Sequence, residues 1–406
     1  MRPLYRLATA AYHGAVHLAA LAGNDRARHW VAGRRRPWPE VPPGRPLLWM
    51  HVASLGEFEQ GRPVLELLRR RHPDHFVLLT FFSPSGYERR HDTALADAVA
   101  YLPHDTPATA RRWVRHLDPA LAVFVKYDFW YYHLRELHAR GTPTYLIAGS
   151  FRPGQPFFRP YGRWYRRVLH FFTRLIVQTP RDRELLLGAG LPPDRVAVGG
   201  DPRMDRTLEL AAQPFTDPVL AAFTAGHPTL IAGSVWQPDV AALAGAWPTL
   251  PPDWRLLLAP HQLHEPELER WAGRFGAVRY SRTDPGEAAG ARVLLLDTIG
   301  LLSRAYRYGA LAYVGGAFRS GLHNTLEPLA YGLPVVFGPR YRKFPEATMA
   351  LARGGAFSVA SAAELNAVLN RLARDDGGRR SAGAAQRELA RALRGSARRT
   401  AEKVVL

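Results

Sequence analysis

The chain has 406 residues, which is enough for two domains of ordinary size. Hydrophobic residues make up 47% of it and charged residues 22%, a composition that excludes a disordered chain. Cysteine is absent, which excludes disulfides, thiolate metal sites and cysteine nucleophiles. The net charge of +19 favours anionic partners such as anionic lipid, phosphorylated substrates or nucleic acid, although no nucleic-acid-binding signature accompanies it.

The first 21 residues predict a helix. Apolar residues recur at helical spacing between positions 4 and 18, with arginines on both sides of the segment. Polar residues interrupt it, so it falls short of the roughly 20 apolar residues of a membrane-spanning helix. We predict an amphipathic helix that lies on an acidic membrane surface. A helix that packs on the domain and a cleaved signal peptide are the alternatives.

Beyond the proline-rich segment 37–43, short apolar runs alternate with helical stretches, which predicts an α/β fold with parallel sheets covered by helices. The predicted strands form two series, at 47–52, 76–82, 121–125, 144–148 and 175–178, and at 229–232, 254–259, 293–296, 311–314 and 335–337. The Gly-Gly-Asp-Pro segment within 199–206 predicts a domain boundary. We therefore predict an N-terminal helix with a basic linker (1–36), two Rossmann-like domains (37–205 and 206–380) and a C-terminal helix (381–406) that packs back on the first domain.

In open α/β sheets, ligands bind beyond the carboxyl ends of the strands. After the first strand come Ser54, Gly56 and Glu57, and a carboxylate in a cleft can act as a general base. Glu57 in a first helical turn is equally explained by the helix dipole.

Two further turns in the first half follow strands. Ser83, Ser85 and Gly86 open a helix and form either an anion pocket or a simple N-cap. Lys126 and Asp128 come next to aromatic residues and form either substrate contacts or an internal ion pair. We take all five as candidate substrate-binding residues.

The segment 315–328 carries the strongest motif. It follows the predicted strand 311–314 and consists of a glycine-rich loop and the start of a helix. Gly315 and Gly316 let backbone N–H groups approach an anion, and Asn324 and Glu327 share one face of the following turn. A nucleotide site is one interpretation, and an ordinary connecting loop between strand and helix is the other. Further small or polar residues follow the other strands of this half, namely Ser234, His261, Thr298 and Gly300.

At these residues the chain resembles the 3-deoxy-D-manno-oct-2-ulosonic acid (Kdo) transferases of lipopolysaccharide synthesis. The resemblance runs from the N-terminus to about residue 350. It is carried by Ser-Leu-Gly-Glu at 54–57, Ser-Pro-Ser-Gly at 83–86, Asp-Thr-Ile-Gly-Leu-Leu at 297–302, His-Asn-x-x-Glu-Pro at 323–328, Gly-Leu-Pro-Val at 332–335 and Phe-Gly-Pro at 337–339. The chain departs from the family at Lys126, where members commonly have an acidic residue, and at Pro-His-Gln (260–262), where many have Pro-Arg-His.

The resemblance implies a glycosyltransferase B fold, with two Rossmann-like domains facing across a cleft. It implies an inverting transfer of Kdo from CMP-Kdo to a lipid A precursor such as lipid IVA, with Glu57 as the general base. The first domain would bind the acceptor through Ser54, Gly56, Ser83, Ser85, Gly86, Lys126 and Asp128. The second would bind the donor through Ser234, His261, Thr298, Gly300, Gly315, Gly316, Asn324 and Glu327.

We expect no cofactor and no metal, since the 16 histidines show no paired-ligand spacing. The implied location is the cytoplasmic face of the inner membrane, reached through the N-terminal helix. The alternatives are another nucleotide-sugar enzyme of the same fold, such as an epimerase, and a basic, non-catalytic protein that binds membranes or nucleic acid. The N-terminal leader argues against an epimerase.

Overall fold

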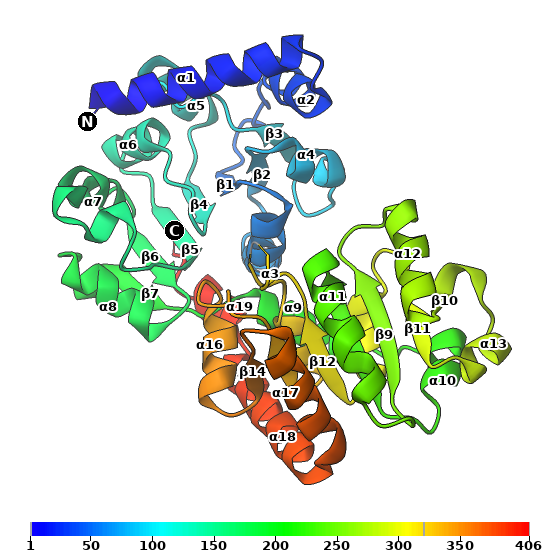
Figure 1. The fold of residues 1–406 in the computed structure, drawn as a ribbon. Coiled ribbons are helices and arrows are strands. Elements are labelled where there is room, and N and C mark those ends of the chain that lie inside the picture. The colour runs from blue at the N-terminus through cyan, green and yellow to red at the C-terminus, as the bar shows by residue number, and fades with distance from the viewer. Residues whose placement is uncertain (1, 320, 406) are drawn as a thin grey trace. The chain divides into compact units, whose positions relative to one another are not determined.

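The computed structural model describes residues 2–319 and 321–405, and Figure 1 shows its elements. The chain divides into unit 1 (Met1–Arg203 with Gly395–Leu406) and unit 2 (Met204–Arg394). The boundary predicted between residues 205 and 206 comes two residues after the first crossing between the units.

Unit 1 contains a seven-stranded sheet in the order β3-β2-β1-β4-β5-β6-β7, and every strand pair in it is parallel. Its strands are β1 (Leu47–Val52), β2 (Phe76–Phe81), β3 (Ala98–Tyr101), β4 (Leu121–Val125), β5 (Thr144–Gly149), β6 (Arg174–Val177) and β7 (Val196–Val198). Its helices are α1 (Arg2–Leu21), α2 (Asp25–Gly33), α3 (Leu55–Arg71), α4 (Pro84–Arg90), α5 (Pro107–Leu117), α6 (Tyr131–Ala139), α7 (Arg163–Leu169), α8 (Pro180–Gly188) and α19 (Ser396–Ala401).

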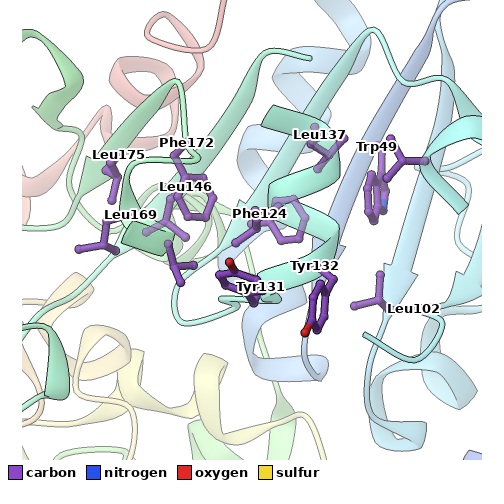
Figure 2. Close-up of a cluster of buried hydrophobic side chains, with 14 of the residues drawn as sticks. Trp49, Leu102, Phe124, Tyr131, Tyr132, Leu137, Leu146, Leu169, Phe172 and Leu175 are labelled. Atoms are coloured by element: carbon purple, nitrogen blue, oxygen red, sulfur yellow. The ribbon is translucent and has the colours of Figure 1, made fainter. Parts of the chain in front are cut away.

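Hydrophobic residues cover both faces of this sheet, because alternate side chains of each strand point to opposite faces. Trp49, Phe124 and Leu146 pack on one face with residues of α5, α6 and α7, as Figure 2 shows. Met50 and Val123 pack on the other face with residues of α3, α4 and α19. A parallel sheet covered on both faces confirms the Rossmann-like prediction for this half.

Unit 2 repeats the architecture with the order β10-β11-β9-β8-β12-β13-β14, again all parallel. Its strands are β8 (Thr229–Val235), β9 (Arg255–Pro260), β10 (Val278–Arg279), β11 (Val293–Leu295), β12 (Leu311–Val314), β13 (Val335–Phe337) and β14 (Ala356–Ser358). Its helices are α9 (Arg203–Ala212, which begins at the boundary), α10 (Pro218–Thr224), α11 (Gln237–Ala246), α12 (Glu265–Phe275), α13 (Pro285–Gly290), α14 (Leu302–Ala305), α15 (Leu326–Ala330), α16 (Pro345–Ala352), α17 (Ala362–Arg374) and α18 (Asp376–Leu393). The prediction of a second Rossmann-like unit is confirmed.

The C-terminal segment forms two helices where one was predicted over 381–406. Helix α18 belongs to unit 2, whereas α19 belongs to unit 1 and packs on α3. The chain changes direction at Gly395, whose φ of 80° lies in the left-handed region that glycine adopts without strain.

Helix α1, the long blue helix in Figure 1, is fastened to unit 1 along one side. The Tyr5 hydroxyl donates to the buried Asp105 carboxylate (2.5 Å), and the His13 and His104 rings lie 3.8 Å apart. The opposite side exposes a stripe of apolar residues, including Leu7 (67% exposed) and Leu18 (69%). Helix α1 therefore packs on its domain, as one alternative expected, and also presents apolar surface outward. Within the described ranges, no helix combines the length and apolar character needed to cross a membrane.

Candidate functional site

Both sheets have a topological switch point, where neighbouring strands lead their chains off in opposite directions. In unit 1 it lies between β1 and β4, and in unit 2 between β8 and β12. Ligands of open α/β sheets bind at the carboxyl ends of such strand pairs. At the carboxyl ends of these four strands lie Glu57 in the first turn of α3, Asp128 after β4, Ser234 near the end of β8 and Gly315 after β12. The predicted residues thus lie where each sheet is suited to bind a ligand.

Glu57 lies in the first turn of α3, directly after β1, and its side chain is partly exposed. Ser54 is the N-cap: its hydroxyl accepts from the Gly56 N–H (3.3 Å) and donates to a Glu57 carboxylate oxygen. The cap fixes Glu57 at the end of the strand and leaves its other oxygen free of this bond. The structure shows the capping interpretation, and the same cap orients the carboxylate, while the general-base role of Glu57 stays a prediction.

Asp128 is a second carboxyl near Glu57, and it is 7% exposed. Burial, followed by the negative charge of Glu57, raises the pKa of Asp128 well above its ordinary value, while an N–H from Ala53 opposes the shift. Burial and the nearby charge therefore favour the protonated form of Asp128 relative to that of an exposed aspartate. Asp128 is thus largely shielded from solvent, and its role in acceptor binding stays a prediction.

His51 lies beside Asp128, 3.7 Å away, but the two do not form an ion pair. The indole N–H of Trp130 donates to His51 Nε2 (3.0 Å), so this nitrogen carries no proton. The other ring nitrogen, Nδ1, donates to the Thr80 hydroxyl (2.9 Å). Complete burial, followed by the charge of His133, lowers the pKa of His51 well below 6.5. These contacts and the lowered pKa make His51 a neutral, structural histidine.

The two serines of the predicted anion turn lie together, with 3.0 Å between the hydroxyl oxygens of Ser83 and Ser85. Arg26 of α2 donates to the Ser83 hydroxyl (3.3 Å), which adds a positive charge to the turn. A Cβ on Gly86 would lie 2.3 Å from the Phe81 ring and 3.0 Å from the Leu55 nitrogen. Glycine at this position is required by packing of α4 against β2 and the start of α3.

Two strained residues lie at the switch points. Lys126, directly after β4, has φ 68°, and Ser234, near the end of β8, has φ 54°. Among residues 2–319 and 321–405, only two other non-glycine residues have positive φ, Asp118 and Ala148. Such conformations cost of order 1–3 kcal/mol each and are concentrated at functional sites. The strain is consistent with a ligand-binding role for both candidate residues.

In unit 2 the glycine-rich loop packs tightly against the end of β8. A Cβ on Gly315 would lie 2.5 Å from the Ser234 carbonyl oxygen, and the Gly315 N–H donates to the Gly233 carbonyl (2.9 Å). Gly316 has φ 91°, and a Cβ there would meet the His323 ring at 2.6 Å. These two positions therefore require glycine, and they bring the loop to Ser234. Ser320 of the same loop lies outside the described residues.

Three aromatic rings stack above this loop. The rings of His261 and His323 lie 4.1 Å apart at 19°, and the rings of His261 and Trp236 lie 4.6 Å apart. The Trp236 indole donates to His323 Nε2 (2.7 Å), and the Arg319 guanidinium lies 4.3 Å from the Trp236 ring centroid. The rings of Trp236 and His323 lie 6.3 Å apart, so the three form a compact cluster. An aromatic cluster with a cation over one ring is a surface on which a nucleobase can stack. Trp236 and Arg319 are not among the candidate site residues from the sequence, which were chosen as small or polar residues that follow predicted strands.

Asp239 links the aromatic rings to the glycine-rich loop, and it too is not among the candidate residues from the sequence. Its fully buried carboxylate accepts from the Trp236 N–H (2.9 Å), the Gly316 N–H (2.9 Å) and the Tyr313 hydroxyl (2.7 Å). One side chain thus joins helix α11, strand β12 and the glycine-rich loop. Asp239 lies three residues after the N-cap Trp236 and accepts from its backbone N–H, which is one half of a capping box.

The other predicted donor residues lie on neighbouring segments. The Asn324 amide donates to Glu327 (2.9 Å) and its oxygen accepts from the Leu326 N–H (3.1 Å), so Asn324 orders the start of α15. Thr298 and Gly300 belong to the loop between β11 and α14; Gly300 is exposed with φ 91°. No described contact joins these two to the aromatic stack.

Sequence comparisons identify the family to which the chain belongs. The family described as 3-deoxy-D-manno-octulosonic-acid transferase (kdotransferase) matches residues 28–206. The 3-deoxy-D-manno-octulosonic acid transferase of Bordetella pertussis is 30% identical over 351 residues, covering 81% of this chain and 79% of that protein. The chain belongs to this family. The Kdo transferases of Aquifex aeolicus (27% identity; 80% of this chain, 85% of that protein) and Chlamydophila psittaci (27%; 74% and 71%) are similar relatives.

Solved structures of other enzymes share the fold of this Kdo transferase family member. A putative UDP-N-acetylglucosamine 2-epimerase from Listeria monocytogenes superposes with a TM-score of 0.60 at 12% identity, covering 87% of this chain and 96% of the epimerase. The epimerase from Neisseria meningitidis bound to UDP-GlcNAc gives 0.59 at 13% identity, with coverages of 86% and 99%. At these identities the likeness shows the fold alone.

The histidine stack makes the stability of the Kdo transferase dependent on pH. Burial, followed by the charge of His261, lowers the pKa of His323 from 6.5 to about 4. Because the folded value lies below the unfolded one, the stabilisation is complete above pH 6.5 and is lost as the pH falls from 6.5 through 4. We expect the thermal midpoint of His323→Gln, followed by circular dichroism, to fall less over this window than that of the unmodified chain. An equal fall in the two proteins would contradict the assignment.

Proposed function

We propose that this transferase moves Kdo from CMP-Kdo to a hydroxyl of a lipid A precursor, with inversion at the anomeric carbon. The observation that carries the proposal is the pairing of two switch-point sites: a carboxylate suited to general-base work in unit 1, and a glycine-rich loop under an aromatic stack in unit 2. The first suits activation of an alcohol, and the second suits a nucleotide.

In the proposed reaction, Glu57 takes the proton of the acceptor hydroxyl. The acceptor oxygen then forms a bond to the anomeric carbon of Kdo while the bond from that carbon to the CMP phosphate oxygen breaks, and its electron pair leaves with CMP. Glu57 lies directly after β1 with a partly exposed side chain, whereas Asp128 is buried, so Glu57 is the carboxylate of the two that an acceptor hydroxyl can reach as the base. Ser83, Ser85 and Lys126 supply polar groups for the acceptor.

The nucleotide half of the proposal rests on unit 2. The stack of Trp236, His261 and His323 supports binding of a cytosine ring, and the loop at Gly315 and Gly316 supports close approach of the phosphate. Hydrogen-bond donors aimed at a departing phosphate stabilise its charge in the transition state. We propose that the reaction needs no resident metal ion.

The transfer is tested by giving the purified full chain CMP-Kdo and an acylated, bisphosphorylated lipid A precursor and measuring the mass of the lipid product. A product heavier by one or more Kdo residues supports the proposal and counts the residues added. An unchanged lipid, with the chain folded and CMP bound, would contradict it.

We further propose that the protein binds the cytoplasmic surface of the inner membrane through the exposed apolar side of α1. We expect Leu7→Asn combined with Leu18→Asn to reduce sedimentation with anionic vesicles at least tenfold. The double substitution removes from the lipid interface two apolar side chains that are more than two-thirds exposed. The control is Leu263→Asn, which removes an exposed leucine of unit 2. Equal vesicle binding by the double variant and the control would refute the membrane role of α1.

A further inference from the structure

Unit 1 contains an apolar groove between α1, α2 and the segment that follows β2. Its volume is about 470 Å³, within the range of about 300 to 1,000 Å³ that small-ligand sites occupy. Its walls include Tyr12 and Val16 of α1, Ala27 and Trp30 of α2, and Phe82 after β2. The groove is therefore lined by aliphatic and aromatic carbon, which favours an apolar ligand.

One edge of the groove is polar and positively charged. Arg26 and Ser83 belong to its lining, and the Arg26 guanidinium donates to the Ser83 hydroxyl (3.3 Å), which lies 3.0 Å from that of Ser85. Residues 2–36 contain seven arginines and one acidic residue. An occupant with an apolar tail and an anionic head matches this combination of walls, edge and charge.

The groove is continuous with the elements that hold Glu57. The Phe82 ring lies 4.6 Å from that of Trp130, whose indole donates to His51 at the end of β1. On the other side, the first turn of α4 packs directly against Leu55, two residues before Glu57. A ligand in the groove therefore has its polar end near the loops that form the candidate site of unit 1.

We infer that this groove holds one acyl chain of the acceptor lipid, while a phosphate of the same molecule lies at Arg26 and the two serines. The inference rests on the proposed function for its choice of acceptor. It gives α1 and α2 a role beyond contact with a membrane: they bind the substrate that is to be modified. The exposed apolar side of α1 would then guide the acyl chain of the acceptor from the lipid bilayer into the groove.

The test uses a matched pair of variants in α1. Ala15 lines the groove and is exposed, so Ala15→Phe fills the groove without burdening the core. Ala10 is also exposed but points away from the groove, so Ala10→Phe adds the same apolar bulk elsewhere on the helix. We expect Ala15→Phe to raise KM for the acylated acceptor at least tenfold. We expect Ala10→Phe to leave it unchanged, and both variants to match the unmodified chain with a fully deacylated acceptor.

A second readout needs no turnover. Dodecyl phosphate with a diazirine at the end of its chain is photo-crosslinked to the full chain, and the labelled peptides are identified by mass. We expect label on residues 12–30 or 82–84, and its loss in Ala15→Phe but not in Ala10→Phe. Label elsewhere, or label that persists in Ala15→Phe, would overturn the inference.

The two measurements distinguish failure of the lipid site in the groove from failure of the proposed transfer activity. If the unmodified chain transfers no Kdo while the label still maps to the groove, the proposed function fails and the lipid site stands. If transfer proceeds and Ala15→Phe leaves KM for the acylated acceptor unchanged, the groove does not hold the acceptor, whatever the label shows.

Discussion

Replacing Glu57 by glutamine is expected to lower kcat for Kdo transfer by roughly a hundred- to ten-thousandfold, the range that a general base contributes. The amide keeps the size of the side chain and can still accept from the Ser54 hydroxyl, so helix α3 retains its N-terminal contacts. It cannot take a proton from the acceptor. Since the candidate nucleotide-binding residues all belong to unit 2, CMP affinity measured by calorimetry is expected to stay unchanged.

The control is Glu59→Gln, two residues further along the same helix. Glu59 pairs with Arg90 (2.8 Å) and belongs to no candidate site, so its neutralisation is expected to leave transfer nearly normal. Turnover by Glu57→Gln within a factor of three of the Glu59→Gln rate would exclude Glu57 as the base.

Replacing Asp239 by alanine is expected to raise KM for CMP-Kdo by at least tenfold and to destabilise unit 2 by about 3 kcal/mol. The alanine leaves three donors without their acceptor, each costing roughly 1–3 kcal/mol if it stays buried. It also releases the glycine-rich loop from Trp236 and the aromatic stack. KM is read from initial rates, and stability from thermal unfolding.

Two comparisons separate positioning from stability. Asp239→Asn retains an acceptor for the two backbone N–H groups, so we expect it to restore most of the donor affinity. Asp182 is a buried carboxylate in unit 1 that likewise accepts two backbone N–H groups and a hydroxyl, from Phe151, Thr179 and the Thr179 side chain. We expect Asp182→Ala to lower stability without raising KM for the donor. A similar rise in KM for both alanine variants would reduce Asp239 to a purely structural residue.

The predictable part of the fold consisted of its central strands. The predicted runs at 47–52 and 121–125 coincide with β1 and β4, because a buried parallel strand is apolar along its whole length. The strands that were not predicted, such as β3, β7 and β14, lie at or near the sheet edges and have only three or four residues. Their half-buried side chains give too little periodic signal.

Helix starts were harder to predict than strands. Helix α3 begins at Leu55, and Gly56 and Gly61 weaken the helical pattern of its first two turns. A Cβ on Gly61 would lie 2.9 Å from Val125, so this glycine serves the packing of α3 on β4 and does not interrupt the helix.

The candidate site was predictable where backbone geometry dictates the residue. Gly315 is a glycine because the loop packs against β8, Gly316 because its φ is positive and His323 is close, and Ser54 is a serine because α3 needs an N-cap. Trp236, Asp239 and Arg319 were not predictable from strand ends alone, since their roles depend on contacts with residues 74 or more positions away or on ring stacking. Asp128 could be placed near the site, but its proximity to Glu57 depends on the order of β1 and β4 in the sheet.

The central claim is a direct transfer from a nucleotide donor to a lipid acceptor by this one chain. The most direct test measures CMP release and Kdo incorporation into the acylated acceptor in the same reaction. We expect CMP to be released only when the acceptor is present, in a molar amount equal to that of the Kdo found on the lipid. CMP released at the same rate without the acceptor, or Kdo-free lipid at the end of the reaction, would contradict it.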